Sequence, residues 1–185
     1  EKGNILHDID ASDALWISGR DLLCDAGYEQ YEVSNFAKKG FESHHNCAYW
    51  RMEDYEGIGA GAVGTVKDFR YANTKDIASY TAFWRDEKKI FRSEISRSEI
   101  PQSIRAAEHL SEKDRILEFL MMGFRMREGI SSREFSRRFS LPLEDVIGTV
   151  FARWAGRGLA EKCGERYRLT GEGLLFLNDF LTELA

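Results

Sequence analysis

Residues 31–66 read YEVSNFAKKGFESHHNCAYWRMEDYEGIGAGAVGTV, and we take the rest of the chain outward from this stretch. It combines two adjacent histidines, aromatic side chains and several glycines with little helical or strand periodicity. We therefore predict that residues 35–73 are irregular. A loop of this length in a compact domain is usually functional or disordered, and its aromatic content argues against disorder. The sequence thus places the chemistry of the chain here.

The composition of the chain limits its domain count and its class of function. A chain of 185 residues that is 43% hydrophobic can bury a core in one or two domains. The net charge of -5 argues against a general nucleic-acid or anionic-membrane binder. We find no apolar run of the roughly 18 residues that span a bilayer and no signal-peptide pattern, so we expect a cytoplasmic protein. Three cysteines without paired spacing indicate reduced thiols, with no self-contained metal or iron–sulfur site.

The first ninety residues predict few regular elements. Asp10 or Ser12 is expected to cap a helix that ends near Gly27, and residues 28–33 read as a strand, which is the αβ half of a β/α repeat. Thr74 is expected to cap a second helix, and residues 92–107 are the best linker candidate. The predicted buried positions of the two helices are Leu15, Leu22, Leu23 and Ala26 in the first, and Ile77, Tyr80 and Trp84 in the second.

The C-terminal third carries the clearest fold signal. Ser111 with Asp114, and Ser131 with Glu134, match helix-capping pairs, and Pro142 suits the start of a third helix. Residues 159–162 and 166–169 read as a hairpin, and Thr170 is expected to cap a final helix. Three helices, a two-stranded wing and a closing helix describe a winged-helix arrangement. The predicted inward positions of the third helix are Val146, Ile147, Val150 and Trp154.

Each polar motif also has a plainer interpretation. Residues 59–64 fit GxGxxG, but no hydrophobic strand precedes them and no helix follows, so a dinucleotide site is disfavoured. The run is either a loop that approaches a ligand closely or merely a tight turn. Adjacent residues diverge in direction, so His44 and His45 do not suggest a protein-only metal site. Axial ligation of heme, or a hydrogen bond to a ligand, needs one imidazole and suits His45 better.

Two further patterns have structural alternatives. The pair Tyr49 and Trp50 is more often a packing contact than a stacking platform for a ligand. A winged helix suggests DNA, yet Glu144 and Asp145 lie near the start of the third helix, where attraction to phosphate is needed. We therefore expect no nucleic-acid partner and favour a packing module.

The segments YEVSNFAKKGFESHHNCAYW, DYEGIGAGAVGTV and YANT, in this order, resemble the oxygen-independent coproporphyrinogen III oxidase-like radical S-adenosylmethionine proteins. The resemblance is closest to the heme-chaperone branch of that family. The tail, from DRILEFLMMGFRMREGIS to RYRLTGEGLLFLNDFL, is similar to the family's C-terminal domain. The likeness covers almost the whole chain and is therefore more specific than any single motif.

This resemblance implies an α+β fold class, with the end of a partial (β/α) barrel followed by a winged-helix-like domain. Residues 1–91 would hold the last β/α unit and the ligand-facing loops, 92–110 a linker, and 111–185 the C-terminal domain. The family's CxxxCxxC cysteines, which hold a [4Fe-4S] cluster beside S-adenosylmethionine, would lie before Glu1. The chain by itself is then expected to be inactive.

The resemblance also implies the ligand residues. The family's HNxxYW motif, associated with heme or substrate contact, falls on His45, Asn46, Tyr49 and Trp50. The loop that lines the S-adenosylmethionine and porphyrin side of the barrel falls on Gly59, Ala60, Gly61, Ala62 and Val63. This chain departs from the family at the end of that loop, where Val63 and Gly64 stand in place of the usual His-Ser.

The implied function is that of a heme chaperone, which binds heme through the His45 region and delivers it to an acceptor protein. A membrane-associated acceptor and a homodimer are among the expected partners. The alternative within the same fold is oxidative decarboxylation of coproporphyrinogen III. A third hypothesis, a non-catalytic winged-helix binding module, leaves the glycine loop unexplained.

Overall fold

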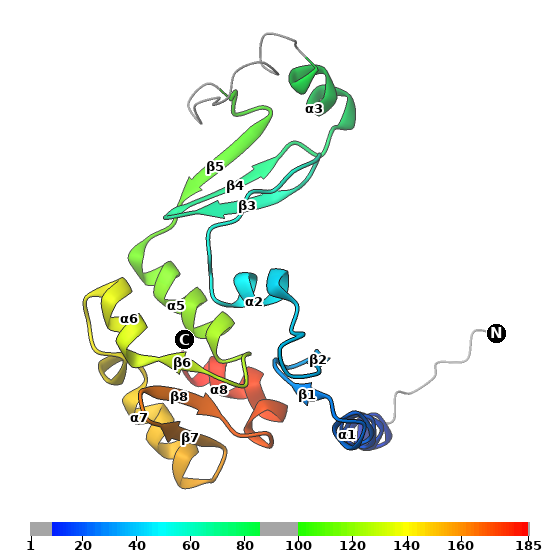
Figure 1. Cartoon of the computed structure of the whole chain (residues 1–185). Helices are drawn as coiled ribbons and strands as arrows, with labels where there is room; N and C mark the ends of the chain where they lie inside the picture. The colour runs from blue at the N-terminus through cyan, green and yellow to red at the C-terminus, as the bar shows by residue number, and fades with distance from the viewer. Residues whose placement is uncertain (1–8, 86–99, 185) are drawn as a thin grey trace, which may run out of the picture. The chain divides into compact units, whose positions relative to one another are not determined.

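The computed structural model describes residues 9–85 and 100–184, which form two compact units. Unit 1 comprises the described residues up to Cys47 together with those from Gly123 onward, and unit 2 comprises those from Ala48 to Met122. Both units mix helices and strands (Figure 1), so the predicted α+β character is confirmed. The two units are taken in turn.

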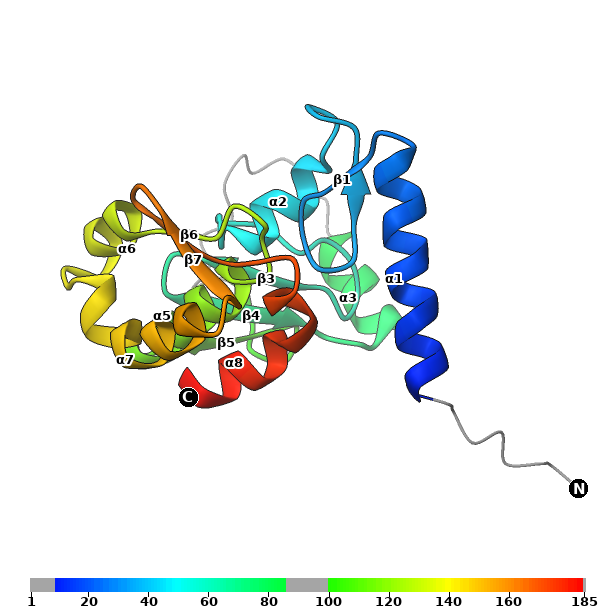
Figure 2. The ribbon, with the colours of Figure 1, turned by 90° about the horizontal axis from the view of Figure 1, so that it is seen from below.

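Unit 1 begins with a long helix and a short antiparallel pair of strands. Helix α1 (Ile9–Asp25) ends at Gly27, whose φ of 83° is the left-handed conformation expected after a helix. Strand β1 (Glu29–Gln30) runs beside α1 (Figure 2) and pairs antiparallel with β2 (Phe36–Ala37). The predicted helix and its glycine end are confirmed. The predicted cap at Asp10 or Ser12 is wrong, because the helix already begins at Ile9.

The predicted apolar face of α1 is not the one that unit 1 covers. Leu15 and Leu22 are 74% and 71% exposed, whereas Trp16 packs its ring against Phe36, with centroids 6.2 Å apart. The helix therefore carries apolar residues on more than one face. The prediction from periodicity selected the face that the structure leaves exposed. The predicted burial of Leu15, Leu22, Leu23 and Ala26 is wrong, because all four are exposed in the structure.

The rest of unit 1 is a small helical domain with a three-stranded sheet. The sheet has the antiparallel order β6-β8-β7, and Ser131 caps α6 by accepting a hydrogen bond from the Glu134 backbone N–H at 3.3 Å. The predicted cap, the hairpin and the start of a helix after Pro142 are confirmed. The elements are β6 (Ile130–Ser131), α6 (Ser132–Phe139), α7 (Leu143–Gly156), β7 (Ala160–Cys163), β8 (Arg166–Leu169), the 3-10 helix η2 (Gly173–Phe176) and α8 (Leu177–Leu184).

An aromatic cluster holds this domain together. The Phe180 ring lies 4.8 Å from the Phe124 ring and 5.0 Å from the Trp154 ring, both in edge-to-face geometry, and all three side chains are buried. The Trp154 indole N–H donates to Glu183 at 3.1 Å, so the buried polar atom is satisfied.

Helix α7 buries a face that the sequence predicted in part. Ile147 and Trp154 are buried as expected, whereas Val146 is exposed and Val150 is half-buried. Buried positions of α7 that the prediction missed are Leu143 and Phe151.

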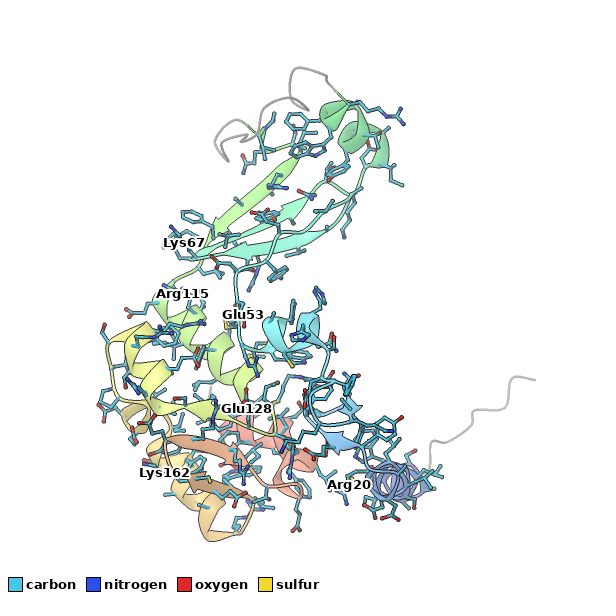
Figure 3. All side chains as sticks on the ribbon, in the orientation of Figure 1. Arg20, Glu53, Lys67, Arg115, Glu128 and Lys162 are labelled. Carbon is cyan, nitrogen blue, oxygen red and sulfur yellow. The ribbon has the colours of Figure 1, made fainter. Side chains whose placement is uncertain are left out.

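Unit 2 is built on the antiparallel sheet β3-β4-β5, formed by β3 (Val63–Val66), β4 (Phe69–Asn73) and β5 (Arg105–His109). Lys67, labelled in Figure 3, lies in the turn between β3 and β4 with a φ of 57°. The prediction that residues 35–73 are irregular is wrong, since they include β2, β3, β4 and α2 (His44–Trp50). Their strands are short and interrupted by glycine, which obscured the alternation.

Two helices complete unit 2. Helix α3 (Ile77–Trp84) is capped by Asp76, which accepts from the Ser79 N–H, and not by the predicted Thr74. Ile77 is 69% exposed, so its predicted burial is wrong. Helix α5 (Glu112–Gly123) begins with the predicted contact, in which Ser111 Oγ accepts from the Asp114 N–H at 3.2 Å.

The predicted linker needs a correction. Residues 105–109 form β5 and pair along their whole length with β4, so this part of the linker is sheet. Residues 92–99 lie outside the described residues. The domain boundaries proposed at 91 and 111 stay predictions. In the part of the chain that the structure describes, no helix is long and apolar enough to cross a membrane.

Phe180→Ala should destabilise the C-terminal part of unit 1 strongly. Removing a fully buried ring that contacts two others costs about 3–5 kcal/mol, because lost burial and a residual cavity add. The free energy of unfolding, measured in urea, checks this expectation. The control Phe176→Ala removes a ring that is 47% exposed and should cost less than about 1 kcal/mol. Equal losses in both variants would contradict the central role of the cluster.

Candidate functional site

The HNxxYW motif lies on α2, a helix of seven residues. Its first turn is closed by Ser43, whose backbone O accepts from the Cys47 N–H at 2.9 Å. Residues four apart share a face of a helix, so His45 and Tyr49 fall on one side, and Asn46 and Trp50 on the next. The motif was predicted to lie in a loop, whereas in the structure it lies on a helix.

Both histidines are exposed on this helix. Neither His44 nor His45 makes a hydrogen bond or ion pair with any residue that the structure describes. Asn46 is half-buried, and its Nδ2 donates to the Tyr31 hydroxyl at 3.5 Å within unit 1. The accessible imidazole of His45 is therefore available to a ligand, while Asn46 is tied to the scaffold.

The aromatic end of α2 belongs to unit 2. Tyr49 meets Trp50 edge-on at 5.4 Å and packs against Tyr55 at 5.2 Å. A hydrogen bond with Tyr55, together with burial, raises the pKa of Tyr49 above its usual value. This is a packing arrangement, although Tyr49 keeps 39% of its surface exposed. The stacking alternative would use that exposed face.

In the glycine loop, residues 57–62, several backbone N–H groups already bond to acceptors within the chain. Gly59 and Gly61 take φ angles of 112° and 74°, which disfavour other residues. The Gly61 N–H donates to the Thr74 carbonyl at 2.8 Å, and the Ala62 N–H donates to the Gly59 carbonyl at 3.3 Å. These amides are occupied, so they do not form the vacant anion cradle of a phosphate-binding loop.

Polar side chains from β4 and α3 hold the same loop. The Tyr71 hydroxyl accepts from the Gly57 N–H at 2.8 Å, and the Tyr80 hydroxyl accepts from the Gly59 N–H at 2.9 Å. The buried Asn73 amide donates to both the Gly57 and Gly59 carbonyls, at 3.1 and 3.0 Å. The Tyr71 hydroxyl donates in turn to Glu56, and burial together with this bond raises the pKa of Tyr71.

What the loop presents outward is apolar. Ile58 is 89% exposed and Val63, the first residue of β3, is 43% exposed. The region is thus better suited to an apolar ligand surface than to phosphate, in agreement with the rejection of a dinucleotide site.

The Tyr71 ring leaves no room for a side chain at position 64, which is a steric reason for glycine there. A Cβ at this position would approach Tyr71 Cε1 to 2.7 Å, closer than real Cβ contacts come. The Tyr71 ring occupies the space that a serine side chain would need. The placement of Tyr71 therefore accounts for glycine at position 64.

The predicted site residues fall in both units. His45 and Asn46 lie in unit 1, whereas Tyr49, Trp50 and the loop residues Gly59, Ala60, Gly61, Ala62 and Val63 lie in unit 2. The sequence missed the residues that support the loop, namely Glu56, Tyr71, Asn73, Tyr80 and Arg105. Tyr71 and Asn73 are two apart in YANT and so share a strand face, a signal that was lost when the segment was taken for loop.

The described residues offer no ligand set for a metal cluster. Cys24 and Cys163 are exposed and Cys47 is buried, and no three His, Cys, Asp or Glu side chains among the described residues come together as metal ligands. These residues do not fit a [4Fe-4S] cluster, and we derive no step through one.

A separate cavity lies within unit 1. It is an open pocket of about 960 Å³ between α1, β1 and the β8–η2 region, and its lining includes Arg20, Cys24, Tyr28 and Arg127. None of the predicted ligand residues lines it. Basic and acidic side chains alternate around it, since Glu29, Glu128 and Glu172 face the same space. Its composition selects no ligand charge.

Comparison with known proteins identifies the family of the chain. Residues 110–176 match the HemN C-terminal domain. The chain is 33% identical over 174 residues to the heme chaperone HemW of Escherichia coli, covering 91% of this chain and 42% of that protein. It is 33% identical over 153 residues to heme chaperone HemW of Lactococcus lactis subsp. lactis, covering 83% of this chain and 36% of that protein. The chain belongs to the HemN-like radical S-adenosylmethionine family.

A mouse protein and a solved bacterial structure are also similar to this chain. A mouse protein named radical S-adenosyl methionine domain-containing protein 1, mitochondrial, is 31% identical over 184 residues, which is 96% of this chain and 40% of that protein. The solved structure of coproporphyrinogen III oxidase (HemN) from Escherichia coli, described as a radical SAM enzyme, matches with a TM-score of 0.60 at 15% identity. It covers 91% of this chain and 39% of that one, and it supports the fold alone. This HemN-like chain spans about two-fifths of the length of these relatives.

Gly64→Ala should disturb the sheet beneath the glycine loop. The new Cβ meets the Tyr71 ring, and the displaced ring weakens its bond to Gly57, so we expect a loss of about 1–3 kcal/mol in the free energy of unfolding. The control Gly148→Ala meets no atom within 4 Å inside α7 and should stabilise the chain by about 0.5–1 kcal/mol. Chemical denaturation distinguishes the two signs. A neutral Gly64→Ala variant would show that the ring can move freely.

Proposed function

We propose that this chain is the ligand-facing C-terminal part of a heme chaperone, which binds heme and delivers it to an acceptor protein. The observation that carries the proposal is the 32–33% identity to curated heme chaperones over 83–92% of this chain. The relatives are longer, so the activity of the whole protein is inferred from them. Radical S-adenosylmethionine relatives imply a [4Fe-4S] cluster and S-adenosylmethionine elsewhere in that protein, where they would supply radical chemistry.

The architecture fits this assignment. We infer that residues 9–85 correspond to the last β/α unit and ligand-facing loops of a partial barrel. The order of α5, α6, α7 and the β7–β8 hairpin supports a winged-helix-like C-terminal domain. Glu144 at the start of α7 accepts a hydrogen bond from the Tyr167 hydroxyl and pairs with Lys162 at 3.4 Å, which ties the hairpin to the helix. This supports a packing module with no nucleic-acid partner.

The site suggests how heme would be held. His45 offers an exposed imidazole, and a heme iron needs a single axial nitrogen from the protein. The exposed apolar side chains of Tyr49, Ile58 and Val63 suit a flat hydrophobic ligand. We assign His45 as the candidate axial ligand. Asn46 of unit 1, and Tyr49, Trp50 and the loop residues 59–63 of unit 2, are the other candidate ligand residues.

The alternative is oxygen-independent decarboxylation of coproporphyrinogen III. It is favoured by the HemN C-terminal domain match and by the HemN fold. The whole protein, reconstituted with its cluster, distinguishes the two functions: formation of protoporphyrinogen IX would promote the alternative, and heme binding without turnover supports the chaperone. The acceptor, its association with a membrane, a homodimer and the cytoplasmic location stay predictions.

His45→Ala should weaken heme binding by the whole protein. Titration with ferric heme is expected to give a Soret change in the wild type and a dissociation constant roughly tenfold or more higher in the variant, a loss of about 1.4 kcal/mol or more. The matched control His44→Ala removes an exposed imidazole from the adjacent position of α2, and this variant should bind heme as the wild type does. Identical spectra for wild type and His45→Ala would remove His45 from the account.

A further inference from the structure

We propose that Arg105 is a positioning residue for the glycine loop, residues 57–62, and that it acts through the side-chain amide of Asn73. Arg105 and Asn73 lie directly opposite one another on β5 and β4. The loop lies between α2 and β3 in sequence. The two side chains that hold its shape come from later strands, Asn73 from β4 and Arg105 from β5. Only the link from loop shape to heme binding rests on the proposed function.

Asn73 is the direct clamp on the loop. Its side chain is 3% exposed, and its Nδ2 donates to the carbonyls of both Gly57 and Gly59. An amide NH2 has two hydrogens, and here each has a loop acceptor within 3.1 Å. One buried side chain therefore ties together the two ends of a three-residue segment that otherwise has glycine freedom.

Arg105 decides which way this amide points. The two ends of an asparagine amide have nearly the same shape, so packing alone does not select between them. A guanidinium only donates, and Arg105 Nε donates to Asn73 Oδ1 at 2.8 Å. A flipped amide would set its NH2 against that donor and its oxygen against the two carbonyls. The arginine therefore reinforces the orientation in which the NH2 faces the loop carbonyls.

Arg105 is itself held in place by the same side of the sheet. Its guanidinium lies 4.0 Å from the centroid of the Tyr71 ring, and its side chain is only 13% exposed. Nη1 lies 3.8 Å from a carboxylate oxygen of Glu56, the residue to which the Tyr71 hydroxyl donates. Because Tyr71 also accepts from the Gly57 N–H, the arginine, the tyrosine and the asparagine converge on one loop.

A loop fixed in this way presents a constant surface to a ligand. Ile58 is the residue between the two glycines whose carbonyls are clamped, and it is 89% exposed, so the backbone that carries its side chain is fixed by the clamp. Sites lose affinity when the groups behind them are loose. Loosening the Asn73 clamp should therefore weaken ligand binding without removing any group that touches the ligand.

Hydrogen–deuterium exchange of the whole protein without ligand tests the positioning role. Asn73→Asp keeps the acceptor for Arg105 and replaces the donor to the loop by an oxygen. We expect exchange of the loop amides of residues 57–62 to rise on the order of ten- to thirtyfold. The Leu110 amide, which bonds to Asp68 at the other end of the sheet, should exchange as in the wild type.

Three variants separate amide orientation from mere packing. Arg105→Met keeps an unbranched apolar stem and loses the donors of the guanidinium, so loop exchange should rise. Arg105→Lys retains a group that only donates and should restore at least half of the protection. The control Glu108→Gln lies on the same strand but pairs with Arg70, at 3.5 Å on the other side of the sheet, and should leave the loop unchanged.

The outcomes decide between the proposals. Wild-type loop exchange in Asn73→Asp or Arg105→Met overturns the inference, as does equal exchange in the Lys and Met variants. Raised loop exchange with heme affinity reduced several-fold in Asn73→Asp supports it. Raised exchange with unchanged heme affinity overturns the role of the loop in binding. If the wild type binds no heme, the proposed function fails, and loop exchange alone decides the role of Arg105.

Discussion

The pairing of β4 with both of its neighbours is the constraint on which unit 2 depends. Strand β4 contacts β3 along one edge and β5 along the other, and β5 is more than thirty residues further along the chain. Alternate residues of β4 point to one side, so Tyr71 and Asn73 both reach the glycine loop. If β5 were not in register, Arg105 would not lie opposite Asn73, and the loop would lose a contact that no local sequence provides.

The part of the fold that the sequence predicted well is the part set by local rules. Caps at Ser111 and Ser131, the helix after Pro142 and the hairpin at 160–169 follow from contacts between residues close in sequence. Strand β6 was missed, since its two residues join the sheet only by pairing with β8. The sheet of unit 2 was missed for the same reason, because β5 pairs across a long separation.

The sequence named the candidate site residues but did not predict their secondary structure. The motif resemblance named His45, Asn46, Tyr49, Trp50 and the loop residues 59–63, and their part in ligand binding stays a prediction. Their local structure could not be derived, since a seven-residue helix and a glycine turn have little periodicity. Asn73 lies in the segment YANT, but its supporting role was not predicted, and Arg105 belongs to none of the motifs. Asn73 donates to loop carbonyls and Arg105 donates to Asn73, and such bonds leave no periodic pattern in the sequence.

The closed hydrogen bonding of the glycine loop has a thermodynamic consequence. The amides of Gly57, Gly59, Gly61 and Ala62 already have acceptors within the chain, so the loop is ordered before anything binds. A ligand that meets a preformed surface avoids the entropic cost of ordering it, and its affinity then depends on shape and apolar contact. The abundance of glycine in this segment thus reflects tight backbone folding, and the loop is hydrogen-bonded despite its glycines.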